Sequence, residues 1–403
     1  MEKTVERKRI VYFDVLNVLA CLCVVGMHCN GAVHAFSDSS VWRQSLLVDV
    51  LAYWAVPVFV MLSGATLMNY RRRYSTKVFL RRRFLKTGVP LVIWTVFFYV
   101  FYRTRGTIAW TGWRAFSNSV INFSIVPVYW FFPPLFMVYL SLPVLSLLVQ
   151  NRKILWYMTV LAFASCSVFP FVCTALGLTY WGSFAFPMMG GYLLFAVLGY
   201  LLHTTELSRL QRSAIYVLGI LGAAVRYFYT VIFSVREGAI NKLTWEYTNW
   251  PTILLAAAIF VFIKYACDYP IFRNEKFIRL IKWLSGASFG IYLIHVLVID
   301  RITSWFSVDT LSGWWRLFGA FAVYFACSKT SVTSRSSVNV KVSPLISDTD
   351  RSRRRPFLSA SIWEMGMMPP DTLPKLSKTF IVPPVLSTTP FEIKIFPSPF
   401  SSK

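Results

Sequence analysis

The sequence predicts an all-α fold: a polytopic membrane bundle of about ten transmembrane helices, followed by a disordered C-terminal tail. Hydrophobic residues make up 56% of the 403 residues and charged residues only 14%, whereas a typical soluble domain is about one quarter charged. Aromatic residues reach 17%, which suits lipid-facing helices and interfacial belts. Apolar runs long enough to cross a bilayer also recur along the chain.

The net charge of +24 comes from 41 lysines and arginines against 17 aspartates and glutamates. In a soluble protein such an excess would point to nucleic acid as a partner. Here the basic residues lie between apolar runs, as they do in the cytoplasmic loops of membrane proteins. We therefore expect contact with membrane lipid and none with nucleic acid.

The first apolar run directly follows a basic segment that contains Lys3, Arg7, Lys8 and Arg9. This run, from Ile10 to about Gly31, is too long for the apolar part of a signal peptide and has no clear cleavage site. We therefore expect it to remain in the protein as the first transmembrane helix.

Ten apolar runs have a length and composition that suit a membrane span. They lie at residues 10–30, 47–69, 88–103, 127–149, 154–174, 185–202, 214–233, 250–266, 283–300 and 313–327. If the N-terminus is cytoplasmic, the inner segments carry 20 lysines and arginines and the outer loops carry seven. This bias favours a cytoplasmic N-terminus, and it places the basic segment from Arg71 to Lys86 on the cytoplasmic side.

The composition of the chain changes after Cys327. Residues 328–403 hold ten of the 20 prolines and no apolar run long enough to cross a membrane. Such a segment cannot bury enough apolar surface to offset the entropy cost of ordering it. The sequence therefore predicts a membrane domain over residues 1–327 and a disordered tail over residues 328–403. Because this tail begins inside a short apolar run, a shifted reading frame is one hypothesis for its origin, which sequencing the coding DNA across codons 320–335 would test.

The first predicted helix carries three polar side chains, Asp14, Asn17 and His28. Polar groups within a membrane usually face a bundle interior or a water-filled cavity. Asp14 and Asn17 share a face because they are three residues apart, and Asn17 and His28 lie on nearly the same stripe, about 16 Å apart along the axis. One side of this helix should therefore face a polar surface.

His28 is the residue that we expect to transfer a proton, because histidine titrates near neutral pH and can accept a proton from a hydroxyl group. The alternative is an interfacial histidine that only bonds a neighbour. His34 is a weaker candidate for the same role, and His203 is expected at the end of a helix. No nucleophile elbow, phosphate loop or metal-binding motif occurs in the sequence, so no metal site is predicted.

Two other predicted helices also contain polar residues. Tyr292 and His295 share a face of the ninth predicted span. These two side chains can serve packing between helices or belong to a site, and both interpretations remain open. Arg226 is isolated in the seventh span, and its burial requires a carboxylate, a carbonyl oxygen or water as a partner.

The basic segment before the third span has three interpretations. It can determine topology, or it can bind anionic lipid at on the order of 1 kcal/mol per charge. It can also bind phosphate, because arginine pairs with phosphate oxygens in a bidentate manner. In that case Arg83 and Lys86, just before Pro90, would hold the phosphates of a nucleotide-like donor.

Five short motifs occur in a fixed order: Tyr12-Phe13-Asp14 with Asn17 and His28, the segment Val56 to Gly64 that includes Ser63, Arg83-Phe84-Leu85-Lys86, Tyr129-Trp130-Phe131-Phe132, and Ser288 to His295. Together they resemble the acyltransferase 3 family of bacterial membrane O-acyltransferases, in the short form without an appended esterase-like domain. The resemblance covers roughly residues 8 to 327. Asn17 stands where the family often has arginine, and Lys86 stands where it has the second arginine of a pair.

The resemblance implies transfer of an acyl group, expected to be acetyl, from acyl-CoA to a hydroxyl group of a cell-envelope sugar, lipid-linked sugar or polysaccharide in the bacterial inner membrane. It implies a catalytic set of Asp14, Asn17 and His28, an acyl-CoA-binding set of Arg82, Arg83 and Lys86, and a substrate-binding set of Ser63, Trp130, Tyr292 and His295. Acyl-CoA would be a substrate, so no permanently bound cofactor is expected.

Two alternatives remain open from the sequence. One is a transporter or exporter of an acidic or acylated metabolite, and the other is a non-catalytic membrane scaffold. Only an enzyme changes the mass of an acceptor molecule.

Overall fold

The computed structural model describes residues 10–337, with side chains up to residue 328, and every regular element in this part of the chain is helical. The α-helices are α1 (Val11–Cys29), α2 (Ser40–Ala52), α3 (Ala55–Leu67), α4 (Thr76–Thr104), α5 (Trp113–Ile121), α6 (Phe132–Leu145), α7 (Arg152–Phe163), α8 (Phe169–Ala175), α9 (Tyr192–Thr204), α10 (Arg209–Glu237), α11 (Trp250–Ala266), α12 (Glu275–Trp305) and α13 (Gly313–Ser337). Within these residues, eight helical stretches are long and apolar enough to cross a membrane, and α9 is a shorter apolar helix. The predicted all-α membrane bundle is confirmed.

The second predicted span, residues 47–69, is divided between two helices. Helix α2 ends at Ala52 and α3 begins at Ala55. Pro57 has no backbone N–H, so it cannot donate to the carbonyl of Tyr53, four residues earlier. The break lies within the protein core, where Tyr53 and Trp54 are buried. The predicted span is nevertheless part of one stretch, Ser40–Arg72, that is long and apolar enough to cross a membrane.

The third predicted span, residues 88–103, is part of a much longer helix. Helix α4 starts at Thr76 and continues through Pro90 to Thr104. Pro90 lies inside this helix, where it has no N–H to donate to the Lys86 carbonyl. The second half of the basic segment is therefore helical and continuous with the span.

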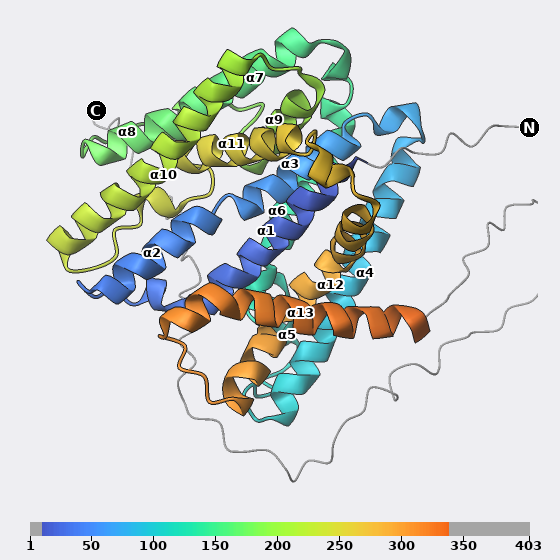
Figure 1. Cartoon of the computed structure of the whole chain (residues 1–403), viewed down its shortest axis with the longest axis vertical. Coiled ribbons are helices and arrows are strands. Elements are labelled where there is room, and N and C mark those ends of the chain that lie inside the picture. The colour runs from blue at the N-terminus through green and yellow to red at the C-terminus, as the bar shows by residue number, and fades with distance from the viewer. Residues whose placement is uncertain (1–9, 338–403) are drawn as a thin grey trace, which may run out of the picture. The chain divides into compact units, whose positions relative to one another are not determined.

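Helix α1 packs against α3, α12 and α13. Figure 1 shows α13 crossing both α1 and α12. Helices α3 and α9 cross at close range because both have glycine at the contact. A Cβ atom on Gly64 would lie 1.8 Å from the Ala196 carbonyl oxygen, and one on Gly199 would lie 2.2 Å from the Met61 carbonyl oxygen. Small residues at such crossings allow membrane helices to approach closely.

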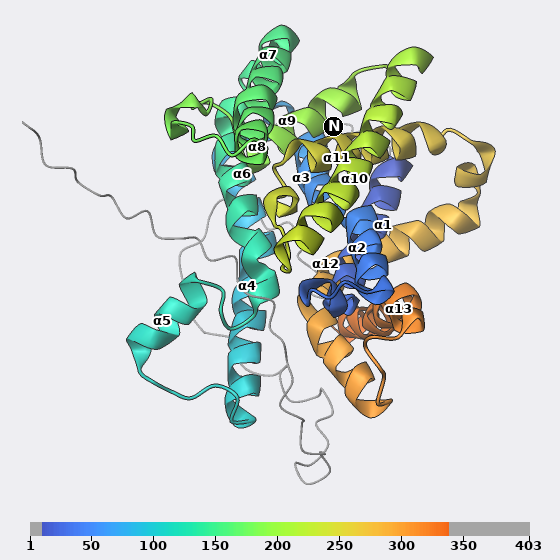
Figure 2. The ribbon, with the colours of Figure 1, turned by 90° about the vertical axis from the view of Figure 1, so that its left-hand side faces the viewer.

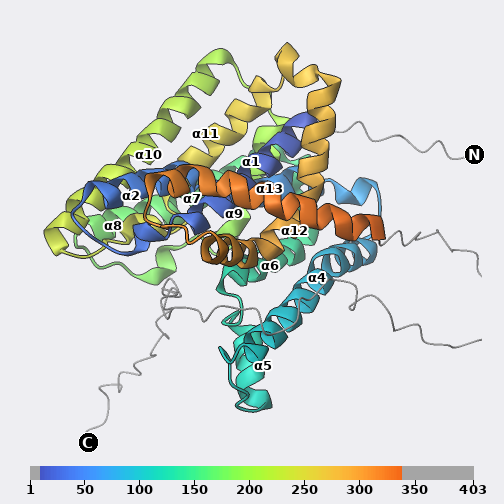
Figure 3. The ribbon, with the colours of Figure 1, turned by 60° about the horizontal axis from the view of Figure 1, so that its bottom comes forward.

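Helix α5 was not predicted from the sequence. It follows α4 and lies beside the C-terminal part of that helix, apart from the other helices of the bundle (Figures 2 and 3). None of its side chains is buried, and Phe116 packs edge to face on Tyr99 of α4, while Trp113 packs on Trp110. Exposed aromatic residues of this kind are typical of the membrane interface.

Helix α13 continues to Ser337, past residue 328 where the sequence analysis started the tail. The remainder of that predicted tail, residues 338–403, lies outside the described residues, as do residues 1–9 with Lys3, Arg7, Lys8 and Arg9.

Candidate active site

Helices α1 and α12 run in the same direction and meet along a polar stripe. Asp14 accepts a hydrogen bond of 2.7 Å from the Ser285 hydroxyl. The amide nitrogen of Asn17 donates to the carbonyl and the hydroxyl oxygens of Ser285, both at 3.0 Å. Nearer the middle of α1, the Cys21 thiol donates to the Ser288 carbonyl at 3.4 Å. The prediction that one side of the first helix faces a polar surface is confirmed, and the surface is α12.

The stripe ends at two histidines. The ring centroids of His28 and His295 lie 5.0 Å apart, with 41° between the ring planes. His295 is fully buried, and its Nδ1 lies 2.7 Å from the carbonyl oxygen of Tyr292. The Tyr292 ring is 5.7 Å from the His295 ring. The structure therefore brings three of the predicted site residues together at the C-terminal half of α1.

Two tyrosines attach the segment before α6 to α12. This segment is η3 (Pro127–Phe131), a 3-10 helix. The Tyr292 hydroxyl donates to the Val128 carbonyl, and the Tyr129 hydroxyl donates to the Leu293 carbonyl at 2.8 Å. These two hydrogen bonds hold η3 beside the two histidines. They also mean that the Tyr292 hydroxyl already donates to a backbone carbonyl.

Trp130, on η3, forms one end of a column of stacked groups. Its ring stacks on Tyr247 at 5.4 Å and 19°. Tyr247 stacks in turn on Tyr53 at 4.1 Å and 9°, and the guanidinium carbon of Arg226 lies 3.2 Å from the centre of the Tyr53 ring. We call these four residues the aromatic column.

Arg226 is paired inside the bundle. Its Nη2 donates to Oδ2 of Asp49 at 2.8 Å, and its Nη1 donates to the Thr244 carbonyl at 3.1 Å. The prediction that this arginine must find a carboxylate, a carbonyl oxygen or water is confirmed. The sequence analysis did not single out Asp49, although a carboxylate within an apolar span was a signal that could have identified it.

The other two histidines lie outside this contact. His34 is in the loop after α1, with its ring 5.7 Å from that of Trp245, and burial lowers the pKa of His34 against the opposing effect of the Asp49 carboxylate. His203 is in the last turn of α9, as predicted, and its Nδ1 lies 2.6 Å from the Tyr12 hydroxyl.

The predicted donor-binding residues lie on the first turns of α4. We call the region of this segment and the start of α1 the basic end, and the region of His28 and His34 the far end. Arg82 lies over the Tyr74 ring at 5.0 Å, and Lys86 is exposed. Arg83 is partly buried, and its Nε has no hydrogen-bond partner among the residues that the structure describes.

Ser63 lies with Arg83 rather than with His28. The Tyr139 hydroxyl is close to the hydroxyls of Ser63 and Thr87 and within electrostatic range of the Arg83 guanidinium. Ser63 also donates to the Phe59 carbonyl of its own helix at 3.0 Å. The predicted site residues therefore divide between the two ends of the bundle.

Comparison with known families identifies the chain. A family model described as an acyltransferase domain matches residues 10–329. The chain belongs to the acyltransferase 3 family. No curated protein and no solved structure shows a match. The family confirms the resemblance seen in the sequence motifs and establishes that the protein is an acyltransferase, with multiple apolar helices that suit a membrane.

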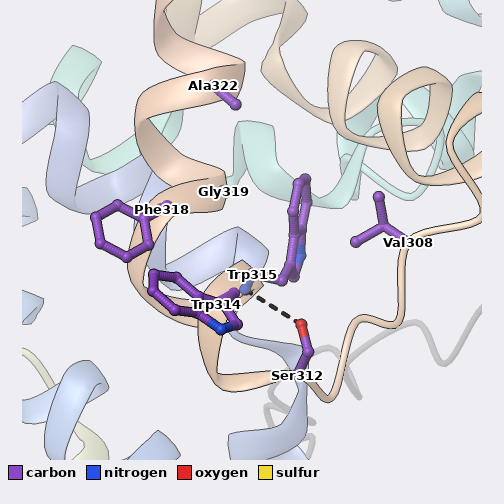
Figure 4. A pocket seen from close by; sticks show the side chains of 7 residues that line it. All are labelled: Val308, Ser312, Trp314, Trp315, Phe318, Gly319 and Ala322. Carbon is purple, nitrogen blue, oxygen red and sulfur yellow. Dashed lines mark hydrogen bonds between the residues drawn. The ribbon is translucent and has the colours of Figure 1, made fainter.

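A hollow in this acyltransferase lies away from the predicted site residues. It has a volume of about 260 Å³ and lies between α13 and the loop before it, lined by Val308, Ser312, Trp314, Trp315, Phe318, Gly319 and Ala322 (Figure 4). The one hydroxyl group of this lining is engaged, because the Ser312 hydroxyl accepts from the Trp315 backbone N–H at 3.2 Å. This lining offers no group for acyl transfer.

Metal ligation finds no support in the described part of the acyltransferase. No group of three or more histidine, cysteine, aspartate or glutamate side chains is arranged there to hold a metal ion. The Cys267 thiol, at the end of α11, has a pKa raised to about 11 by burial, so it is protonated at neutral pH.

Proposed function

We propose that the protein transfers an acetyl group from acetyl-CoA to a hydroxyl group of a cell-envelope sugar or polysaccharide. The phosphates of the donor bind at the basic end, its thioester extends along the polar stripe to His28, and the acceptor binds at the far end beside His28. The observation that carries this proposal is the polar stripe between α1 and α12, which connects Asp14 near the basic end with His28 and His295 at the far end.

The donor side of the proposal rests on the charges of α4. Coenzyme A carries several phosphate groups, and arginine recognises phosphate through paired hydrogen bonds. Arg83 has a buried donor atom without a partner in the described structure, and Arg82 and Lys86 lie on the same turns of the helix. Arg71 is a weaker candidate, because its guanidinium already donates to the Ser146 hydroxyl at 2.8 Å and the Pro143 carbonyl at 2.9 Å.

The acceptor side rests on proton transfer at His28. An alcohol is a poor nucleophile until a base removes its proton. In the proposed reaction the hydroxyl proton moves to a nitrogen of His28, and the hydroxyl oxygen bonds to the thioester carbonyl carbon. The carbon–sulfur bond then breaks, and the coenzyme A thiolate takes up the proton. Asp14 and Asn17 hold α12 in register with α1 through Ser285.

We further propose that the protein lies in a bacterial inner membrane with the basic end in the cytoplasm, where acetyl-CoA is present. The excess of lysine and arginine in the segments on that side supports this orientation. His28 then faces the envelope side, where sugar acceptors are exposed.

The test is a mass comparison of envelope glycans from cells that express the wild-type protein, the His28→Ala variant or neither. We expect acetylated glycan only with the wild type, and equal amounts of the two proteins in the membrane fraction. Acetylation by His28→Ala at the wild-type level would refute the assigned base. A transported metabolite with no acetylated acceptor would favour the transporter alternative.

A further inference from the structure

The hydrogen bond from His295 to backbone determines which of its nitrogens carries the proton. The Tyr292 carbonyl oxygen, 2.7 Å from Nδ1, can only accept. Nδ1 must therefore be the protonated nitrogen of the neutral imidazole, and Nε2 has a lone pair to offer. Nε2 is buried and has no hydrogen-bond partner in the described part of the chain, although a buried polar atom normally has one.

The neighbour placed to satisfy this lone pair is His28. Its ring lies 5.0 Å from that of His295, between centroids, so that rotation of the His28 ring can bring an N–H within hydrogen-bonding distance of Nε2. The Tyr292 hydroxyl is also close to His295, but it already donates its proton to the Val128 carbonyl. The Cys21 thiol is donated to the Ser288 carbonyl.

We propose that His295 is the positioning residue for His28 in acyl transfer, an inference that rests on the proposed function. Nε2 of His295 accepts a hydrogen bond from one nitrogen of His28. This bond leaves the other His28 nitrogen unprotonated and directed at the acceptor hydroxyl. When that nitrogen takes the hydroxyl proton, the His28 imidazolium keeps its hydrogen bond to Nε2, and His295 keeps its own proton on Nδ1. A base held by a second residue in this way has a fixed tautomer and orientation.

Two substitutions separate this role from packing. In His295→Asn the amide nitrogen replaces Nδ1 and keeps the bond to Tyr292, but the acceptor at the Nε2 position is lost. In His295→Gln the side-chain oxygen can take the place of Nε2 and accept from His28. His203→Asn is the matched control, since His203 is bonded to Tyr12 in the first turn of α1, whereas His28 lies in the last turn of that helix.

The experiment measures acetyl transfer by each purified variant in lipid vesicles, with labelled acetyl-CoA and a sugar acceptor. We expect His295→Asn to lower kcat by about 10²-fold, part of the 10²–10⁴-fold that a general base contributes, with KM for acetyl-CoA unchanged. In this variant the His28 imidazolium has no hydrogen-bond acceptor at the former Nε2 position. We therefore also expect the acidic limb of the pH profile of kcat to move to lower pH. His295→Gln should recover most of kcat, and His203→Asn should match the wild type.

A wild-type kcat and pH profile in His295→Asn would overturn the inference. So would equal losses in the Asn and Gln variants that follow their thermal stabilities, because that result assigns His295 to packing alone. Failure of the wild type to transfer acetyl groups would instead refute the proposed function, so the two failures are distinguishable.

Discussion

Arg226 and Asp49 form an ion pair in the interior of the bundle, with 2.8 Å between Nη2 and Oδ2 and side chains only 1% and 7% exposed. The pair joins α10 to α2 at the base of the aromatic column. Because Arg226 also lies over the Tyr53 ring, the ion pair supports the stacking that ends at Trp130.

Loss of one partner of this pair should be strongly destabilising. We expect Asp49→Ala to lower the free energy of unfolding by about 3–5 kcal/mol, because it leaves the guanidinium charge buried without compensation. Thermal unfolding in detergent measures the effect. Asp38→Ala is the control, because the ion pair of Asp38 with Arg43 is about half exposed and should contribute no more than about 1 kcal/mol. The double variant Asp49→Leu/Arg226→Met should be more stable than Asp49→Ala, and the opposite order would contradict this account.

The crossing of α3 and α9 should not tolerate a larger residue. We expect Gly64→Ala and Gly199→Ala each to cost about 1–3 kcal/mol or more, because each new Cβ would meet backbone of the other helix at under 3 Å. Gly182→Ala, where a Cβ would meet nothing within 4 Å, should unfold at the wild-type temperature. Equal unfolding temperatures for all three variants would show that the helices can separate without cost.

The donor site should respond to charge on α4. We expect Arg83→Ala/Lys86→Ala to raise KM for acetyl-CoA by about tenfold or more, since each lost charge-assisted hydrogen bond is worth about 1.5–3 kcal/mol, with a smaller effect on kcat. The control Arg279→Ala/Lys282→Ala removes the same charge from exposed positions of α12 with the same three-residue spacing. An unaltered dependence on donor concentration in the α4 variant would exclude phosphate binding there.

The stability of the polar stripe near the basic end should depend on the amide donor of Asn17. Asn17→Asp replaces the group that donates to Ser285 with one that only accepts, next to the Asp14 carboxylate. We expect a loss of about 1–3 kcal/mol in stability, measured by thermal unfolding at neutral pH. Asn118→Asp, on the exposed helix α5, should change little. An Asn17→Asp protein as stable as wild type would mean that these hydrogen bonds are dispensable.

The sequence predicted those parts of the fold and site that depend on local pattern. Asp14, Asn17 and His28 stand out because polar residues are rare in an apolar helix, and their spacing alone places them on one face. Helix α11 also begins and ends at the predicted residues, 250–266. The break at Tyr53 was missed because the apolar run continues through it, and only the missing N–H of Pro57 marks it.

Other parts of the site depend on pairing between distant segments, which the pattern does not encode. Tyr53 and Tyr247 form the aromatic column with Trp130, but 20 tyrosines and 15 tryptophans in the chain give no sign of which rings stack. Nothing in the sequence marks Ser285 as a partner of the first helix. Its bonds to Asp14 and Asn17 exist because α12 packs on α1.

The hydrogen bond between Asp14 and Ser285 joins residues 271 positions apart, which has a consequence for biogenesis. At about 5–20 residues per second, a ribosome needs on the order of tens of seconds to add that length of chain. If the first helix enters the membrane as it is made, its Asp14 and Asn17 side chains lack their partner on α12 throughout that interval. The membrane insertion machinery, or the helices made in between, must shelter an aspartate and an asparagine until α12 arrives.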